Sequence, residues 1–178
     1  MPPVDRRDDR LGFDESRNLL TETLGKLVPQ WVARRALAVD VEVGRASYAV
    51  GESVRFRVTL RNRLPLPVVV ETLDRRLWGW TVDGELDASD ESRFDDPGRD
   101  TPGTFTFRGG ERRVVSRTWH GRFRRVGDSE GDDGSDGSTR WVDAAPGRHE
   151  LGVFLAYEGG ASATTTFEVV DADADPDP

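Results

Sequence analysis

From residue 36 onward, apolar residues recur at every second position, which is the spacing of a β-strand with one buried face. The clearest run is 54–61, where valine, phenylalanine and leucine alternate with arginine and threonine. We expect eight strands, at 37–43, 54–60, 68–72, 77–82, 104–107, 112–119, 149–157 and 163–170. Turn residues join them and no helix-length pattern lies between them, so the sequence predicts an all-β, two-sheet antiparallel sandwich of seven to eight strands.

One amphipathic α-helix, at 14–35, precedes this sandwich, whose strand pattern is typical of immunoglobulin-like domains. The apolar face of the helix carries Leu20, Leu24, Leu27 and Trp31. Because proline interrupts a helix, we expect Pro29 to kink or end it near Val28, with Trp31 and Val32 in a following turn. A helix of this length is marginal alone, so its apolar face must be buried on the sandwich or in the groove of a partner.

Polar segments surround and interrupt the sandwich, which spans 36–170. They are rich in aspartate, glycine, serine and proline, and they carry too little apolar surface to order themselves. We expect a disordered lead at 1–13, long acidic loops at 85–103 and 127–140, and a disordered acidic tail at 171–178.

The composition is acidic, and almost all of its basic residues are arginine. Aspartate and glutamate number 33 against 25 lysines and arginines, which gives a formal net charge of −8, and Lys26 is the only lysine. An aspartate-rich surface is typical of extreme halophiles, where molar salt screens the repulsion between carboxylates. We therefore expect a halophilic archaeal protein with an acidic surface, and we exclude nucleic acid as a partner because its phosphates would be repelled.

Export and membrane signals are missing from the sequence. The first ten residues are charged, and no apolar run of signal-peptide length follows them. No stretch reaches the roughly 20 apolar residues that a membrane-spanning helix needs. Cysteine is absent, which agrees with a reducing compartment. We expect a cytoplasmic protein without a membrane span.

Two segments resemble known families. The stretch from Tyr48 to Asn62, YAVGESVRFRVTLRN, resembles the opening of many prokaryotic immunoglobulin-like modules. The segments WHG at 119–121 and APGRHEL at 145–151 resemble the ending of the bacterial intracellular proteinase inhibitor family of BsuPI type, with His120 in place of aspartate and His149 in place of tyrosine. This resemblance implies an immunoglobulin-like fold and inhibition of a proteinase. The whole chain is also similar to uncharacterised haloarchaeal proteins.

Catalytic and metal-binding patterns do not occur. The sequence has no G-x-S-x-G turn for a nucleophilic serine, no cysteine nucleophile and no glycine loop ahead of a helix for phosphate. Two histidines without further ligands predict no metal site. We expect His149 to hydrogen-bond the backbone and His120 to be exposed at a strand end. The sequence therefore predicts no enzyme, no catalytic residue, no metal and no cofactor.

Because the sequence shows no catalytic pattern, binding to a partner is the remaining function, and the tryptophans are candidate binding residues. Trp119 should be in the core, whereas Trp78 and Trp80 lie two apart on one strand, so we expect both in the core or both exposed as a binding patch. The candidate partner-binding residues are Trp78, Trp80, Leu20, Leu24, Leu27 and Trp31. The leading hypothesis is a non-catalytic module that binds another protein or self-associates through its N-terminal helix. The alternative is an intracellular proteinase inhibitor.

Overall fold

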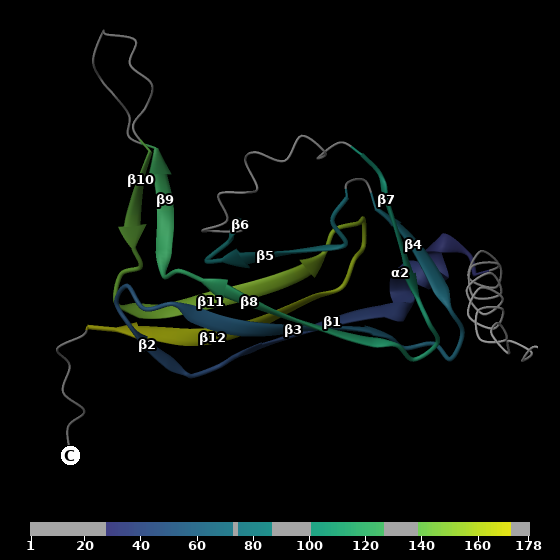
Figure 1. Cartoon of the computed structure of the whole chain (residues 1–178), viewed down its shortest axis with the longest axis horizontal. Helices are drawn as coiled ribbons and strands as arrows, with labels where there is room; N and C mark the ends of the chain where they lie inside the picture. The colour runs from purple at the N-terminus through teal and green to yellow at the C-terminus, as the bar shows by residue number, and fades with distance from the viewer. Residues whose placement is uncertain (1–27, 73–74, 87–100, 127–138, 172–178) are drawn as a thin grey trace, which may run out of the picture.

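The computed structural model describes residues 28–72, 75–86, 101–126 and 139–171, which form one helix and twelve strands (Figure 1). The helix is α2, Gln30–Ala36. The strands are β1 (Leu37–Val43), β2 (Ser47–Ala49), β3 (Val54–Asn62), β4 (Val68–Thr72), β5 (Trp78–Val82), β6 (Glu85–Leu86), β7 (Gly103–Phe107), β8 (Arg112–Trp119), β9 (Arg122–Val126), β10 (Thr139–Asp143), β11 (Gly147–Leu155) and β12 (Ser162–Val170).

Two larger sheets form the body of the fold. One has the order β1-β3-β8 and the other the order β2-β12-β11-β5-β6, and β1 lies against β12 and β11. Two-stranded ribbons extend this body: β4–β7 stands beside α2 at one end, and β9–β10 projects at the other (Figure 1). The pairing of β2 with β12 is parallel, whereas the other pairings are antiparallel. The predicted all-β, immunoglobulin-like sandwich with a preceding helix is confirmed.

The alternation in the sequence decides which side chains the two sheets bury. In β3, every second residue from Val54 to Asn62 is buried, and the arginines between them are exposed. Trp119 at the end of β8 is fully buried, as predicted. Its indole N–H donates to the carbonyl oxygen of Arg122 at 3.0 Å, which satisfies the one polar atom that the ring brings into the core.

All eight predicted strands are present, and four short ones, β2, β6, β9 and β10, add to them. Strand β10 begins inside the segment where we expected a loop at 127–140, since Thr139 and Arg140 belong to it. Strand β9 was not predicted because it reads RFRRV, which has too few apolar residues to show a period. Two parts of the loop expected at 85–103 are also strand: Glu85–Leu86 form β6, and Gly103 begins β7. The structure leaves out 1–27, 73–74, 87–100, 127–138 and 172–178, so most of the other expected loop and disordered residues lie outside its described part.

The structure corrects the expected role of Pro29. We predicted that the helix ends near Val28 and that Trp31 and Val32 form a following turn. Instead, α2 begins directly after Pro29 and holds both residues. Proline is tolerated at this point because the N–H groups of the first turn have no partner within the helix. Pro29 is therefore the N-cap of α2, and the turn expected at Trp31 and Val32 is wrong, whereas the helix expected to end near Val28 falls on residues outside the described part.

This short helix docks on the sandwich through two alanines and one amide. Ala33 and Ala36 are buried. Gln30 donates from Nε2 to the carbonyl oxygen of Val69 at 3.0 Å, and its Oε1 accepts the backbone N–H of Glu71 at 3.4 Å. The side-chain amide thus pairs with the backbone of β4 as a neighbouring strand would, which protects that edge of the ribbon.

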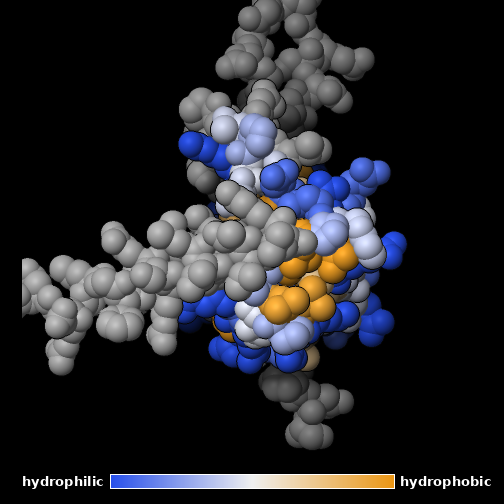
Figure 2. Space-filling view, turned by 90° about the vertical axis from the view of Figure 1, so that its right-hand side faces the viewer, coloured by the Kyte–Doolittle hydropathy of each residue, from blue (hydrophilic) through white to orange (hydrophobic). Residues whose placement is uncertain are grey.

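Of the four residues predicted to form the apolar face of the helix, the structure describes Trp31. The other three, Leu20, Leu24 and Leu27, lie outside the described residues. Trp31 is 65% exposed, so its ring is not part of the sandwich core. Figure 2 shows apolar side chains gathered on the end of the molecule that carries α2 and β4, and Leu66, just before β4, is 56% exposed. A binding role for Trp31 stays a prediction.

The described residues carry a net charge opposite to that of the whole chain. They hold 18 arginines and 12 carboxylates, a formal charge of +6. The other 21 acidic residues belong to segments such as 87–100 and 127–138. The positive charge belongs to the described residues alone, because most of the carboxylates of the sandwich lie in segments outside them. Net charge gives no reason to exclude an anionic partner for this part of the protein.

Candidate interaction site

A cleft of about 440 Å³ lies where β5 of one sheet approaches β8 of the other. Its lining consists of Leu60, Arg75, Arg76, Leu77, Trp78, Trp80, Phe105, Arg113, Val115 and Arg117. Arginine and aromatic residues are the types that protein interfaces favour over the rest of a protein surface. The cleft brings them together in a fold whose other inward positions are mainly aliphatic.

The cleft gives different surroundings to the two tryptophans that we expected to share one. Trp80 is 6% exposed and packs on Phe56 of the facing sheet, with ring centroids 5.2 Å apart. Trp78, two residues earlier on the same face, is only partly buried and lines the cleft. Both rings line the cleft, but Phe56 packs on Trp80, whereas Trp78 is only partly buried against the core. Neither ring is among the exposed large hydrophobic side chains of the described residues, so the structure is nearer to the first of the two alternatives, in which both rings lie in the core.

Two arginines reach this cleft from β8. The guanidinium carbon of Arg117 lies 5.6 Å from the centroid of the Trp78 ring, and that of Arg113 lies 4.0 Å from the centroid of Phe107. Arg113 is also held by Glu111, with Nε 2.8 Å from Oε1. Among the described residues, no carboxylate pairs with Arg117. Its charge therefore stabilises a partly buried aromatic ring and is still available to a partner.

Arg113 and Arg117 are absent from the predicted site, although the period of β8 indicates them. Both share one face of the strand with buried Trp119, because alternate residues point to the same side. Arginine is rarely buried without a partner, so arginine on the inward face of a strand indicates that this face opens to solvent. That signal, read together with Trp78, could have located the cleft.

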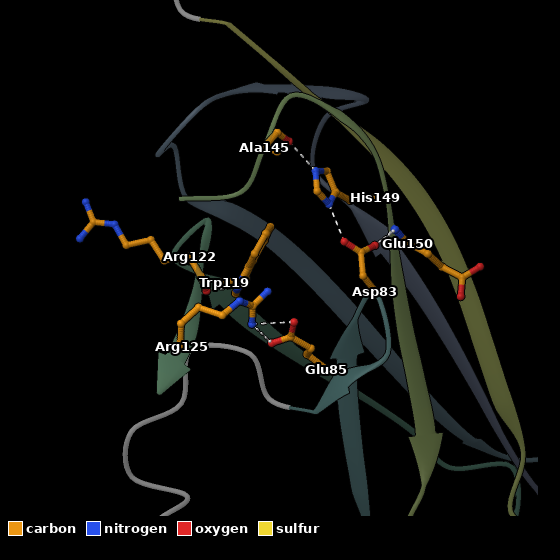
Figure 3. Close-up of polar contacts among 8 residues, drawn as sticks. All are labelled: Asp83, Glu85, Trp119, Arg122, Arg125, Ala145, His149 and Glu150. Carbon is orange, nitrogen blue, oxygen red and sulfur yellow. Dashed lines mark hydrogen bonds and ion pairs between the residues drawn. The ribbon is translucent and has the colours of Figure 1, made fainter. Parts of the chain in front are cut away.

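A separate polar cluster joins the β5–β6 turn to β11 (Figure 3). His149 is 8% exposed, and its Nδ1 lies 2.6 Å from Oδ2 of Asp83 while its Nε2 lies 2.8 Å from the carbonyl oxygen of Ala145. The predicted backbone hydrogen bond of His149 is confirmed. Both ring nitrogens thus lie within hydrogen-bond distance of oxygen atoms of the fold.

Metal-binding clusters and membrane-spanning helices are absent from the described residues. The described ranges contain no group of three or more histidine and carboxylate side chains that could hold a metal ion. His120 is exposed just beyond β8, as expected, with its Nδ1 3.4 Å from Oγ of Ser53. In this part of the chain, no helix is long and apolar enough to cross a membrane.

Comparison with known proteins gives one family and several distant structural neighbours. The sequence profile of DUF7974, described as a family of unknown function, matches residues 25–170. No curated protein matches the chain. The CARDB domain of a Pyrococcus furiosus protein is similar in structure, with 13% identity, 76% of this chain and 94% of that chain covered, and a TM-score of 0.43.

Two larger enzymes contain a similar region. An alkylpurine DNA glycosylase from Pseudomonas fluorescens, solved with DNA containing an abasic site analog, shares 17% identity over 75% of this chain and 30% of that chain, with a TM-score of 0.41. A β-glucosidase from Listeria innocua shares 14% identity over 75% of this chain and 16% of that chain, with a TM-score of 0.42. This chain thus spans less than a third of either enzyme.

Proposed function

This chain belongs to DUF7974, a family of unknown function, and on that premise we propose that it is a non-catalytic module that binds another protein in the cleft between β5 and β8. The observation that carries the proposal is the partial exposure of Trp78 at this cleft, with the guanidinium of Arg117 5.6 Å from its ring. Tryptophan and arginine supply a large share of the binding energy at protein interfaces. An indole kept partly open to solvent beside such a charge is a suitable anchor for a partner.

The rest of the lining supports a partner segment that combines an apolar side chain with carboxylates. Leu60, Leu77 and Val115 provide apolar surface, and Arg75 and Arg117 provide positive charge. Interfaces commonly have an apolar centre and a polar rim. A leucine or phenylalanine flanked by aspartate or glutamate fits this combination.

The surroundings of His149 support a function without catalysis. A general base must present a ring nitrogen to the proton that it removes. In His149, one nitrogen lies against Asp83 and the other against the carbonyl of Ala145. The cluster is therefore better suited to fixing the β5–β6 turn than to chemistry.

The test compares a cleft variant with a matched variant elsewhere. Full-length protein, cross-linked in extract of its own cells, identifies partners, and each is then purified and its affinity measured. We expect Trp78→Ala with Arg117→Ala to weaken binding about tenfold or more. Trp141→Ala with Arg140→Ala, which removes the same residue types from β10, should leave it within about twofold. Unchanged affinity of the cleft variant would refute the proposal.

Inhibition of a proteinase is the alternative that the WHG and APGRHEL segments suggested. The structure gives two of these residues structural roles: Trp119 is fully buried, and a Cβ on Gly121, which has φ of +69°, would lie 2.6 Å from the carbonyl oxygen of Glu52. The same purified protein, titrated against a serine proteinase from its own cells, tests the alternative. Stoichiometric inhibition that survives the cleft substitutions would favour it over the module.

A further inference from the structure

The outer face of the β1-β3-β8 sheet carries a second charged surface, which does not belong to the cleft. Arg55, Arg57 and Arg61 are exposed on the outward face of β3, with Thr59 between the last two, because Phe56, Val58 and Leu60 point into the core. Alternate residues of a strand lie about 7 Å apart on one face. The three side chains therefore form a line of positive charge along β3.

Strand β8 widens this line. Arg112 is paired in register with Arg61, and Ser116 with Arg57. We call Arg55, Arg57, Arg61 and Arg112 the arginine row. Like charges directly opposite one another destabilise a sheet, so stability does not account for the pairing of Arg61 with Arg112. An anionic partner would account for it.

The described residues do not neutralise the arginine row. The side chains of Arg55, Arg57 and Arg61 make no hydrogen bond or ion pair with any of them, and Arg112 donates to Oγ1 of Thr59 at 3.4 Å. Glu42 of β1 is paired in register with Arg57 but makes no ion pair with it. The charges of the row are thus open to a ligand.

A hollow of about 630 Å³ lies over part of this row. Its lining consists of Glu42, Val43, Gly44, Arg55, Phe56, Arg57, Ser116, Arg117 and Thr118. Guanidinium and hydroxyl groups predominate among its polar side chains, and they donate hydrogen bonds to carboxylates. The hollow over the arginine row could therefore hold an anion by its shape as well as by its charge.

We propose that the arginine row binds an extended, acidic segment of another protein, with carboxylates at alternate positions. Such carboxylates are spaced about 7 Å apart, as are neighbouring outward positions of β3. Nucleic acid fits less well because none of the outward residues of β3 and β8 is aromatic, so bases would have no ring on which to stack. The arginine row lies on the outward face of the sheet, and of the residues that line the hollow only Arg117 also lines the cleft. Because Arg117 is not part of the row, substitutions of the row test this proposal separately from the cleft.

The experiment measures binding of a dye-labelled octapeptide of alternating aspartate and alanine to the full chain at low ionic strength. The test variant carries Arg55→Ser, Arg57→Ser and Arg61→Ser. A control variant of equal charge carries Arg35→Ser, Arg108→Ser and Arg148→Ser, which are exposed elsewhere. We expect the test variant to bind about tenfold or more weakly than wild type, and the control variant and Trp78→Ala to bind within about twofold of it.

Two further probes separate this proposal from general attraction between charges. A peptide with four contiguous aspartates and four alanines should bind more weakly than the alternating one. Equal weakening in the test and control variants, or no binding to wild type, would overturn the proposal. Tighter binding of an oligothymidylate of equal charge through the same three arginines would also overturn it, and would identify a nucleic-acid surface instead. Matching thermal unfolding of both variants shows that the substitutions act on binding.

Discussion

Nδ1 of His149 lies 2.6 Å from Oδ2 of Asp83, a contact that joins the middle strand of one sheet to a turn 66 residues earlier in the chain. Asp83 has a positive φ of 50° and is followed by Gly84 at 81°, the backbone of a two-residue hairpin turn between β5 and β6. Its second oxygen accepts the backbone N–H of Glu150 at 2.9 Å. One carboxylate therefore fixes both the turn and its position against β11.

Replacing Asp83 tests this role. We expect Asp83→Ala to lower the free energy of unfolding by about 1–3 kcal/mol, because the N–H groups of His149 and Glu150 both lose their acceptor. Asp83→Asn is the matched control, since asparagine keeps an acceptor oxygen and tolerates a positive φ, so its loss should be smaller. Urea denaturation measures both. Equal stability of the alanine and asparagine variants would contradict the assigned role.

Asn62 anchors the connection between β3 and β4 from inside the fold. Its side chain is fully buried, and Nδ2 donates to the carbonyl oxygens of Leu66 at 2.9 Å and Arg108 at 2.8 Å, while Oδ1 accepts the N–H of Leu64 at 3.0 Å. Aspartate at this position would place a buried carboxylate against two carbonyl oxygens. We expect Asn62→Asp to cost more than about 3 kcal/mol of folding free energy, and Asn62→Ala about 2–3 kcal/mol.

Chemical denaturation checks these values. The neighbouring exposed residue gives the control: Arg63→Ser should change stability by less than about 0.5 kcal/mol. If Asn62→Asp is as stable as this control, the three hydrogen bonds do not contribute as the structure implies. In that case, the asparagine at the end of the stretch from Tyr48 to Asn62 would not be there to hold the connection between β3 and β4.

Long strands were predictable from the sequence because burial of one face marks every second residue. The eight strands and the sandwich were predicted from this alternation of apolar and polar residues. Very short strands carry too few residues to show a period: β6 has two residues. Pro29 was misassigned because proline suits both the end of one helix and the first turn of another, and the local sequence does not distinguish the two.

The candidate site was only partly predictable, since it depends on contacts between distant segments. Trp78 was identified, but its partial exposure arises from a cleft that β5 forms with β8. The carboxylate of Asp83 beside His149 leaves no local pattern in the sequence. Net charge alone is a coarse guide for a similar reason: many carboxylates lie in segments outside the described residues, and the described residues by themselves are net positive.

Gly79 on β5 makes room for the ring of Phe154 on β11. The two residues are paired in register, and a Cβ on Gly79 would lie 2.7 Å from Cζ of Phe154. We expect Gly79→Ala to destabilise the protein by about 1–3 kcal/mol, because the ring must leave its position. Combined with Phe154→Ala, the same substitution should cost at least about 0.5 kcal/mol less than it does alone, as measured by a double-mutant cycle. If the stability losses of the two substitutions simply add, the ring of Phe154 does not restrict the size of the side chain at position 79.

Stability should fall in alkali because of Tyr157. Its hydroxyl donates to the carbonyl oxygen of Arg34 at 2.9 Å, and burial raises the pKa of the phenol to about 12, against the opposing effect of the nearby Arg34 charge. The unfolded chain ionises this group near pH 10. The folded state therefore holds the proton more tightly, and the stability that it gains is complete below about pH 10 and is lost as the pH rises toward about 12.

Urea midpoints measured from neutral pH to about pH 12 test this dependence. Tyr157→Phe should flatten the alkaline part of the profile and cost about 0.5–1.5 kcal/mol at neutral pH, where the lost hydrogen bond is the main change. Tyr48→Phe is the control, and it leaves Tyr157 as the only tyrosine in the chain. In that variant, the phenolate absorbance should appear with a midpoint near pH 12 in the folded protein. An alkaline loss of the same size in Tyr157→Phe would show that another group causes it.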